Sequence, residues 1–145
     1  MARISTYINC PGNTEEAFAL YRTVFGTDYV GPVMRFGDMP AAPGGPELSA
    51  DEKNKILHIE LPLYGGHLLM GTDSLESMGH TQRIGNNTTI QIEPDSRDDA
   101  DRLYRLLADR GSDTTGMQDM PWGAYWGCCL DRFGIRWMIN YPTTA

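Results

Sequence analysis

The chain has 145 residues, 41% hydrophobic and 10% aromatic, which is enough apolar material for one folded domain and too much for general disorder. Nineteen acidic and twelve basic side chains give a formal net charge of −7, which argues against a nucleic-acid backbone or an anionic membrane as the main partner. Sixteen glycines and nine prolines are typical of short elements joined by many turns rather than of a helical bundle.

The three cysteines, Cys10, Cys128 and Cys129, include an adjacent pair and form neither a disulfide framework nor a CxxC zinc motif. Reduced thiols in a cytosolic protein are the simpler interpretation. The N-terminus lacks a signal-peptide core, and no apolar run approaches the ~18 residues of a membrane span. We therefore expect a soluble, cytoplasmic protein.

The first half of the chain predicts a strand, a helix and three further strands. The helix has Glu15 and Glu16 in its first turn, where the helix dipole favours acids, and Gly26 at its end. The predicted elements are a strand at 4–9, a helix from Asn13 or Thr14 to Gly26, and strands at 33–37, 55–63 and 67–72, the last two joined by a turn at Tyr64-Gly65-Gly66.

Two stretches of the first half predict connections. Residues 39–54 contain three prolines, two glycines and mixed charge, and they predict a long surface loop that is a candidate lid. Residues 73–85 are polar and rich in turn formers, and they predict a connector between the two halves.

The second half predicts the same order of elements. Its helix has an acidic first turn, an apolar stripe that includes Leu103 and Leu107, and Gly111 at its end. The predicted elements are a strand at 87–93, this helix, and strands at 114–120, 122–130 and 135–141, with a turn at 131–134 between the last two.

The two halves also share sequence. Leu20-Tyr21-Arg22 recurs as Leu103-Tyr104-Arg105 inside the predicted helices. A shift of 68 places Gly66 on Gly134, Met70 on Met138, His58 on Trp126 and Glu60 on Cys128. We therefore predict an α+β fold of two tandem βαβββ modules, about 1–73 and about 86–141, joined by a connector at about 74–85 within a single domain spanning 1–145. The two modules are expected to form a curved mixed sheet around a central cavity.

Several stretches of the chain resemble the vicinal oxygen chelate superfamily, which includes glyoxalases, bleomycin-resistance proteins and extradiol dioxygenases. Within it, the chain resembles the PhnB-like branch, often catalogued under the domain name 3-demethylubiquinone-9 3-methyltransferase. The matching stretches are 7–17 (YINCPGNTEEA), 20–26 (LYRTVFG), 65–71 (GGHLLMG), 118–127 (QDMPWGAYWG) and 131–139 (DRFGIRWMI). The resemblance implies the fold predicted above and a homodimer.

The resemblance also implies a divalent metal held by the first and last strands of each module. Those positions fall on or near Thr6, Met70, Thr89 (or Asn87) and Met138. Methionine thioethers are soft ligands, whereas such a metal prefers His, Asp or Glu. We therefore predict no metal site at these positions and no other cofactor, although a divalent metal bound elsewhere stays an alternative.

Methyl transfer is not expected, despite the domain name. Methyl transfer from S-adenosylmethionine usually needs a glycine-rich strand-to-helix turn in a doubly wound sheet. No such turn follows a predicted strand.

His58 and Glu60 are the candidate catalytic residues. Two residues apart on a predicted strand, they share one face at roughly 7 Å spacing. Facing a cavity, His58 could act as a general base, and Glu60 could orient it or bind a cation. The alternative is a hydrogen-bonded pair at a sheet edge or a subunit interface.

Aromatic and sulfur-containing residues complete the predicted ligand site. Trp126 is expected to form an aromatic wall for a planar or apolar ligand. Cys128 is expected to face the cavity as a packing residue, whereas Cys129 and Trp137 should face the helix. The predicted ligand-binding residues are Thr6, His58, Glu60, Met70, Thr89, Gln91, Trp126 and Met138.

Two functions remain open at this point. The first is a protein that holds a small apolar or aromatic molecule without a metal. The second is a metal-dependent enzyme of the lyase, isomerase or dioxygenase kind that uses His58 and Glu60.

Overall fold

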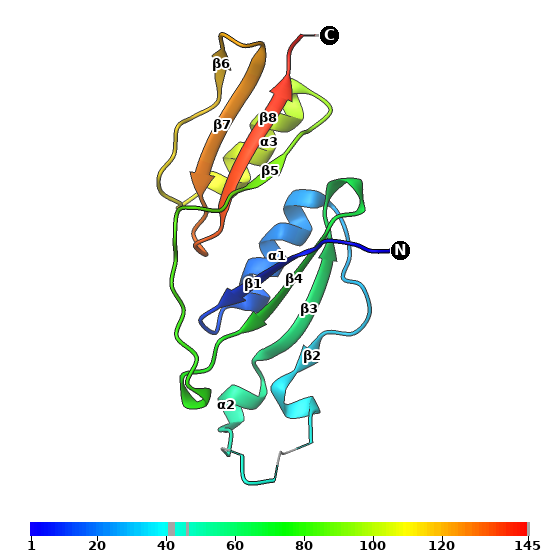
Figure 1. Ribbon diagram of the computed structural model, residues 1–145, viewed down its shortest axis with the longest axis vertical. Coiled ribbons are helices and arrows are strands. Elements are labelled where there is room, and N and C mark those ends of the chain that lie inside the picture. Colours follow the sequence, from blue (N-terminus) through cyan, green and yellow to red (C-terminus); the bar gives the residue numbers. More distant parts are fainter. Residues whose placement is uncertain (41–42, 46, 145) are drawn as a thin grey trace. The chain divides into compact units, whose positions relative to one another are not determined.

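The computed structural model describes residues 1–40, 43–45 and 47–144, and it confirms the α+β class (Figure 1). The chain divides into two compact units, Met1–Arg83 and Ile84–Ala145. Each unit is a βαβββ module with a four-stranded mixed sheet. The single-domain organisation and the cavity expected between the modules stay predictions.

Module 1 has strand order β1-β4-β3-β2. β1 runs parallel to β4, whereas β3 runs antiparallel to both β4 and β2. Helix α1 packs against β3 and β4, so one face of the sheet is covered. The elements are β1 (Thr6–Cys10), α1 (Thr14–Phe25), β2 (Met34–Arg35), α2 (Ala50–Lys53), β3 (Ile56–Pro62) and β4 (Leu68–Asp73).

Module 2 repeats this arrangement with strand order β5-β8-β7-β6. β5 runs parallel to β8, β7 is antiparallel to β8 and β6, and α3 packs against β7 and β8. The predicted repeat is therefore confirmed, and Ile56 and Pro62 at the ends of β3 correspond to Ala124 and Leu130, 68 residues later, at the ends of β7. The elements are β5 (Ile90–Ile92), α3 (Arg97–Ala108), β6 (Gln118–Met120), β7 (Ala124–Leu130) and β8 (Arg136–Pro142).

The helix termini follow from their flanking residues. Gly26 ends α1 in the left-handed conformation, with φ of 63°, and its N–H donates to the Arg22 carbonyl at 2.9 Å. Ser96 begins α3 by accepting a hydrogen bond from Asp99 N at 3.0 Å. The side chain of Asn13 makes no capping bond to α1. Instead, the carboxylate of Asp73, at the end of β4, accepts from Thr14 N at 2.9 Å.

Three local predictions are corrected. The strand at 33–37 shortens to Met34–Arg35, because Arg35 N donates to Asp38 Oδ2 and a 3₁₀ turn follows. The segment 39–54 is not wholly a loop, since Ser49 caps α2 by accepting from Glu52 N; Ala41, Ala42 and Pro46 of that segment lie outside the described residues. The connector begins after Asp73, which still belongs to β4.

Gly111 does not end α3, because Asp109 is the residue that follows its last turn. A Cβ at position 111 would overlap the backbone oxygen of Leu130. Glycine is therefore required there by the close approach of the loop to β7, where Ser112 N donates to the same oxygen at 2.9 Å.

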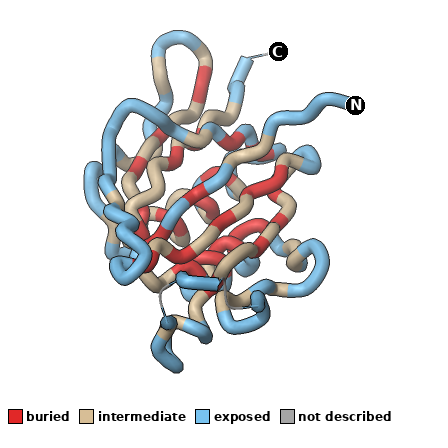
Figure 2. Tube along the Cα trace, turned by 60° about the horizontal axis from the view of Figure 1, so that its bottom comes forward, coloured by how far each residue is buried: buried red, intermediate tan, exposed pale blue. Residues whose placement is uncertain are grey.

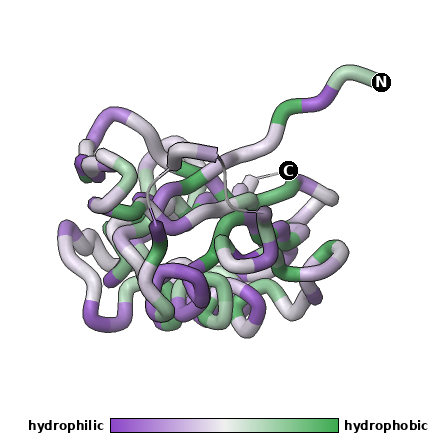
Figure 3. The backbone as a smooth tube through the Cα atoms, turned by 90° about the horizontal axis from the view of Figure 1, so that it is seen from below, coloured by the Kyte–Doolittle hydropathy of each residue, from purple (hydrophilic) through white to green (hydrophobic). Residues whose placement is uncertain are grey.

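The core of each module lies between its helix and its sheet, and buried residues alternate with more exposed ones along the strands (Figure 2). Hydrophobic and hydrophilic residues interchange over short stretches of chain (Figure 3). The fully buried large side chains include Phe18, Tyr21 and Leu69 in module 1 and Trp137 and Leu103 in module 2. No helix within the described ranges is long and apolar enough to cross a membrane.

Candidate functional site

The strand registers decide which side chains lie on the sheet face opposite α1, here called open face 1. Tyr7 on β1 lies beside Met70 on β4, which lies beside Glu60 on β3. His58 lies two residues before Glu60 and beside Met34 on β2. Side chains that are adjacent across strands share a face, so all five residues belong to open face 1.

A chain of hydrogen bonds crosses open face 1. Nε2 of His58 lies 2.9 Å from Oε1 of Glu60, and Nδ1 lies 3.3 Å from the hydroxyl of Tyr7. The Tyr7 and His58 rings are 5.8 Å apart at an interplanar angle of 33°. Tyr7 is 49% exposed, whereas about a quarter to a third of the side chains of His58 and Glu60 is exposed (30% and 26%). The structure therefore brings the predicted pair together and adds Tyr7, which the sequence analysis missed.

The protonation of this chain is constrained by its acceptor. An ionised Glu60 carboxylate can only accept, so Nε2 of His58 carries a proton. In a neutral imidazole, Nδ1 is then an acceptor and the Tyr7 hydroxyl donates to it. Partial burial raises the pKa of Tyr7 above its ordinary value, and a side-chain hydrogen bond with Thr72 opposes this rise. The phenol is thus protonated at neutral pH.

Thr6 does not belong to open face 1. It lies beside Leu69 and shares the side of β1 with buried Ile8 and Cys10, which is the side of α1. Its hydroxyl lies 2.8 Å from Nε2 of His67. Side chains alternate along a strand, so the prediction of Thr6 instead of the next residue, Tyr7, chose a side chain on the face of α1.

Module 2 has a corresponding open face 2, opposite α3. Gln91 on β5 lies beside Met138 on β8, which lies beside Cys128 on β7. Trp126, two residues before Cys128, lies on the same side of β7. The amide of Gln91 donates to Glu93 Oε1 at 3.1 Å. Thr89 is exposed and precedes the first residue of β5, so no strand pairing fixes its direction.

Two other residues of module 2 lie where the sequence predicted, on the face of α3. Cys129 and Trp137 are adjacent across β7 and β8, and both are fully buried. Burial is the main cause that raises the pKa of Cys129 to about 12, with smaller contributions from the nearby Asp131 and Cys128. Cys129 is therefore a packing residue rather than a nucleophile.

The positions that are equivalent in the two open faces offer poor ligands for a divalent metal. The register places Tyr7 and Met70 in module 1 at positions equivalent to Gln91 and Met138 in module 2. A phenol, an amide and two thioethers do not fit a hard or borderline divalent ion. Within the part of the chain that the structure describes, no group of three or more His, Cys, Asp or Glu side chains could hold a metal ion.

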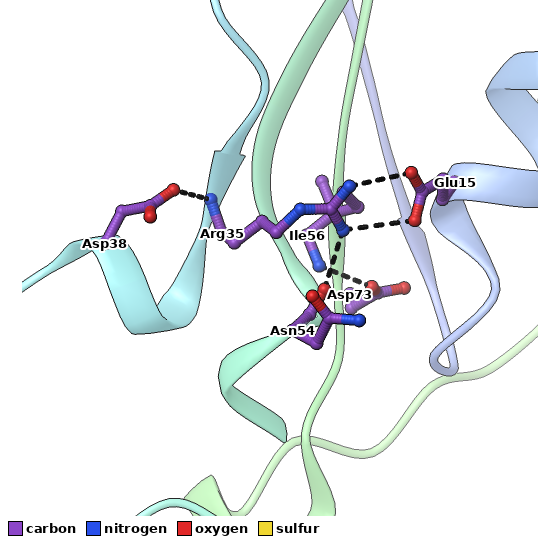
Figure 4. Close-up of polar contacts among 6 residues, drawn as sticks. All are labelled: Glu15, Arg35, Asp38, Asn54, Ile56 and Asp73. Carbon is purple, nitrogen blue, oxygen red and sulfur yellow. Dashed lines mark hydrogen bonds and ion pairs between the residues drawn. The ribbon is translucent and has the colours of Figure 1, made fainter. Parts of the chain in front are cut away.

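A cavity of about 330 Å³ lies beside the start of α1, away from the hydrogen-bonded chain. Its wall includes Glu15, which forms a double ion pair with Arg35 at 3.1 and 2.8 Å; Arg35 also donates to the Asn54 carbonyl at 2.7 Å (Figure 4). The carboxylate of Asp73 accepts from Thr14 N and from Ile56 N, at 2.9 and 2.7 Å. These bonds tie α1, β2 and β3 together, so they explain the fold rather than a ligand. The lining residues are Gly12, Asn13, Glu15, Glu16, Ala19, Asp51, Asn54, Lys55, Ile56 and Asp73.

Comparison with known proteins gives a consistent family. Residues 3–139 match the model of the Glyoxalase/Bleomycin resistance protein/Dioxygenase superfamily. Protein YjdN of Escherichia coli (strain K12) is 24% identical over 142 residues, which cover 94% of this chain and 93% of the relative. The crystal structure of protein PA1353 from Pseudomonas aeruginosa is 31% identical, with a TM-score of 0.81 and coverage of 98% of each chain.

A PhnB protein from Bacillus cereus, which carries a provisional 3-demethylubiquinone-9 3-methyltransferase name, has a TM-score of 0.76. It is 20% identical, and the match covers 97% of this chain and 99% of that one. This likeness establishes a shared fold. The shared fold is the one that the resemblance to PhnB-like proteins implied.

Proposed function

The chain belongs to the Glyoxalase/Bleomycin resistance protein/Dioxygenase superfamily, and from this premise we propose that it binds a small apolar or aromatic molecule on the open face of a sheet, without a divalent metal. The observation that carries this proposal is that a methionine occupies the equivalent position on each open face. These residues are Met70 and Met138, and thioethers suit apolar, polarizable contacts far better than metal binding.

The neighbours of these methionines support an aromatic ligand. Trp126 supplies a large planar surface on open face 2, two residues before Cys128 on β7. On open face 1, Met34 and Met70 supply adaptable apolar surface, while Tyr7 offers a polar end. Thr89, which precedes the first residue of β5, stays a proposed ligand-binding residue. Pockets of this kind use few polar groups to orient an apolar ligand.

A metal-dependent lyase, isomerase or dioxygenase is the second candidate. The contact of 2.9 Å between His58 and Glu60 favours it, because His and Glu are common ligands of catalytic metals. Against it, both ring nitrogens of His58 already have protein partners, Glu60 and Tyr7. Methyl transfer is not proposed, since the name of the PhnB protein from Bacillus cereus comes with a shared fold alone.

The ligand-binding proposal is tested with 4-nitrobenzyl alcohol, a small neutral aromatic compound. We expect saturable binding by calorimetry with a negative heat-capacity change, which marks burial of apolar surface. Trp126→Ala should weaken binding at least about tenfold, as expected for an aromatic anchor. Trp122→Ala is the matched control, because Trp122 is 67% exposed in a turn and should leave the affinity unchanged. Equal affinities in all three proteins would contradict the proposal.

The metal-dependent candidate is tested by elemental analysis of protein purified without chelator. The proposed function predicts no stoichiometric metal in the wild type. Stoichiometric metal that disappears in both His58→Ala and Glu60→Ala would contradict the metal-free proposal and favour the enzyme.

A homodimer and a cytoplasmic location also stay proposals. A dimer would have twice the chain mass of 16.2 kDa by light scattering. A single species at 16.2 kDa across the accessible concentration range would contradict it.

A further inference from the structure

The hydrogen-bonded chain on open face 1 has a direction. Glu60 accepts a hydrogen bond from the protonated Nε2 of His58. Nδ1 of the neutral ring is then the acceptor for the hydroxyl of Tyr7. Glu60 and His58 are the more enclosed members, and Tyr7 is the most exposed. The chain therefore leads from a partly exposed hydroxyl to a carboxylate through an imidazole that can carry a charge.

We propose that Tyr7, His58 and Glu60 form a proton relay that accepts a proton from a weakly acidic hydroxyl group on the bound aromatic molecule. This inference rests on the proposed function, because it specifies which aromatic molecules open face 1 selects. Tyr7 is the residue that contacts the ligand, His58 is the proton acceptor, and Glu60 is a positioning residue that acts through His58.

The proton transfer is balanced within the relay. The ligand O–H bond breaks and its proton passes to the hydroxyl oxygen of Tyr7. The proton that Tyr7 donates moves at the same time to Nδ1 of His58. The products are a ligand oxyanion that accepts a hydrogen bond from neutral Tyr7, and an imidazolium that keeps its Nε2 proton and donates it in a hydrogen bond to the ionised Glu60 carboxylate. No oxidant, reductant or metal is needed.

The surroundings of the relay explain why the ligand must arrive neutral. Among the described residues, the titratable side chains that contact His58 are Tyr7 from β1 and Glu60 on its own strand. Met34 on β2 is its cross-strand neighbour, and Met70 on β4 lies between Glu60 and Tyr7. A ligand that arrives as an anion therefore meets a carboxylate, whereas a neutral hydroxyl compound becomes an anion only when His58 becomes a cation.

The first test measures which nitrogen of His58 carries the proton in the free protein. Long-range proton–nitrogen NMR spectra distinguish the two tautomers, and the chain has only three histidines, His58, His67 and His80. His80 is the internal reference, since its Nδ1 accepts from Leu75 N at 3.2 Å and its proton is therefore on Nε2. We expect the same Nε2–H tautomer for His58, and loss of this preference in Glu60→Gln. A neutral His58 with its proton on Nδ1 would overturn the relay, whether or not a ligand binds.

The second test uses 4-nitrophenol, whose phenolate is recognised by its absorbance, against 4-nitrobenzyl alcohol, which lacks the acidic hydroxyl. We expect the wild type to bind 4-nitrophenol as phenolate below the pH at which the free compound ionises. The apparent pKa of the bound probe should fall by about one unit, equivalent to about a tenfold preference for the ionised form. This fall should disappear in Tyr7→Phe and in His58→Gln.

His67→Gln is the matched control, because His67 bonds to Thr6 on the opposite side of the sheet. It should keep the fall in the probe's apparent pKa. Binding of both compounds with no fall in the wild type would overturn the relay and leave the proposed function standing. If neither compound binds, the proposed function fails and the ligand class assigned here fails with it.

Discussion

The carboxylate of Asp131 lets the stability of module 2 be tested in a quantitative way. Asp131 is 3% exposed and lies at the turn between β7 and β8. Its Oδ1 accepts from Phe133 N at 2.8 Å and from Ile135 N at 3.0 Å. Its Oδ2 accepts from the indole nitrogen of Trp137 at 2.8 Å, and Trp137 is fully buried.

Asp131→Ala removes the acceptor of all three donors. A buried donor left without a partner costs about 1–3 kcal/mol, and bonds to a charged acceptor lie towards the upper end. Because the bonds from the Trp137 indole and from Phe133 N are buried and the bond from Ile135 N is partly buried, we expect a total loss of about 3–5 kcal/mol in the free energy of unfolding. Asp131→Asn keeps one oxygen that can accept from the two backbone N–H groups, but it turns an amide NH₂, which is a donor, toward the indole N–H. We therefore expect a loss of about 1–3 kcal/mol in the free energy of unfolding.

Urea denaturation followed by tryptophan fluorescence measures this loss in module 2. Trp122, Trp126 and Trp137 are the only tryptophans in the chain, and all lie in the second unit. Far-UV circular dichroism follows both modules in the same samples. Asp109→Ala is the matched control, because the side chain of Asp109 is 61% exposed and its ion pair with Arg132 lies at the surface.

We expect Asp109→Ala to stay within about 0.5 kcal/mol of the wild type. If Asp131→Ala loses less than about 1 kcal/mol, the orphaned-donor reasoning is refuted. If Asp131→Ala does not fold, Asp131→Asn still tests the reasoning. A loss of stability in Asp131→Asn no larger than that in Asp109→Ala would refute it.

Three further predictions concern individual side chains. Gly71→Ala should destabilise module 1 by about 1–3 kcal/mol in urea denaturation, because the added Cβ would lie 2.6 Å from the ring of Phe18; an unchanged midpoint would contradict this. Burial raises the pKa of Cys129 to about 12, so Cys128 should react with iodoacetamide first in the native protein, as peptide mapping can show. The guanidinium beside Glu15 lowers the pKa of this carboxyl, so the stability it contributes is present above the unfolded-state pKa and is lost as pH falls through the lowered folded-state pKa. The destabilisation caused by Glu15→Gln should therefore shrink on acidification, and an equal effect at acid and neutral pH would speak against it.

The repeat was predictable because its signals are local and occur twice. The glycines that end the hairpins, Gly66 and Gly134, have φ of 78° and 85°, a conformation that favours glycine. Together with the alternation of Ile59 and Leu61 against His58, they placed β3 and β4 within a residue or two.

The candidate site was predictable only in part, because it depends on which alternate residues of β1 point away from α1. The sequence already held the signal, since Ile8 and Cys10 alternate with Tyr7 and are the apolar residues that α1 covers. Reading them as the covered side would have assigned Tyr7, rather than Thr6, to open face 1. Similarly, Ser49 and Glu52 form a capping box that indicated α2 inside the predicted loop.

Other contacts had no local signal. Asp73 accepts hydrogen bonds from Thr14 and Ile56, which lie 59 and 17 residues away along the chain. From sequence alone, a carboxylate at the end of a strand is typical of a turn. Only the parallel pairing of β1 with β4 brings the start of α1 close to Asp73. Tertiary pairing therefore decides a role that residue type alone leaves open.

The short outermost strands have a consequence for the behaviour of the chain in concentrated solution. β2 and β6 form one edge of their sheets and are two and three residues long. An edge strand is a template for pairing with another chain, and its unpaired N–H and C=O groups grow in number with its length. With so few such groups, these two edges offer little hold for the strand-by-strand growth that leads to ordered aggregates. The sheet faces can thus expose apolar side chains while β2 and β6 resist the addition of further strands.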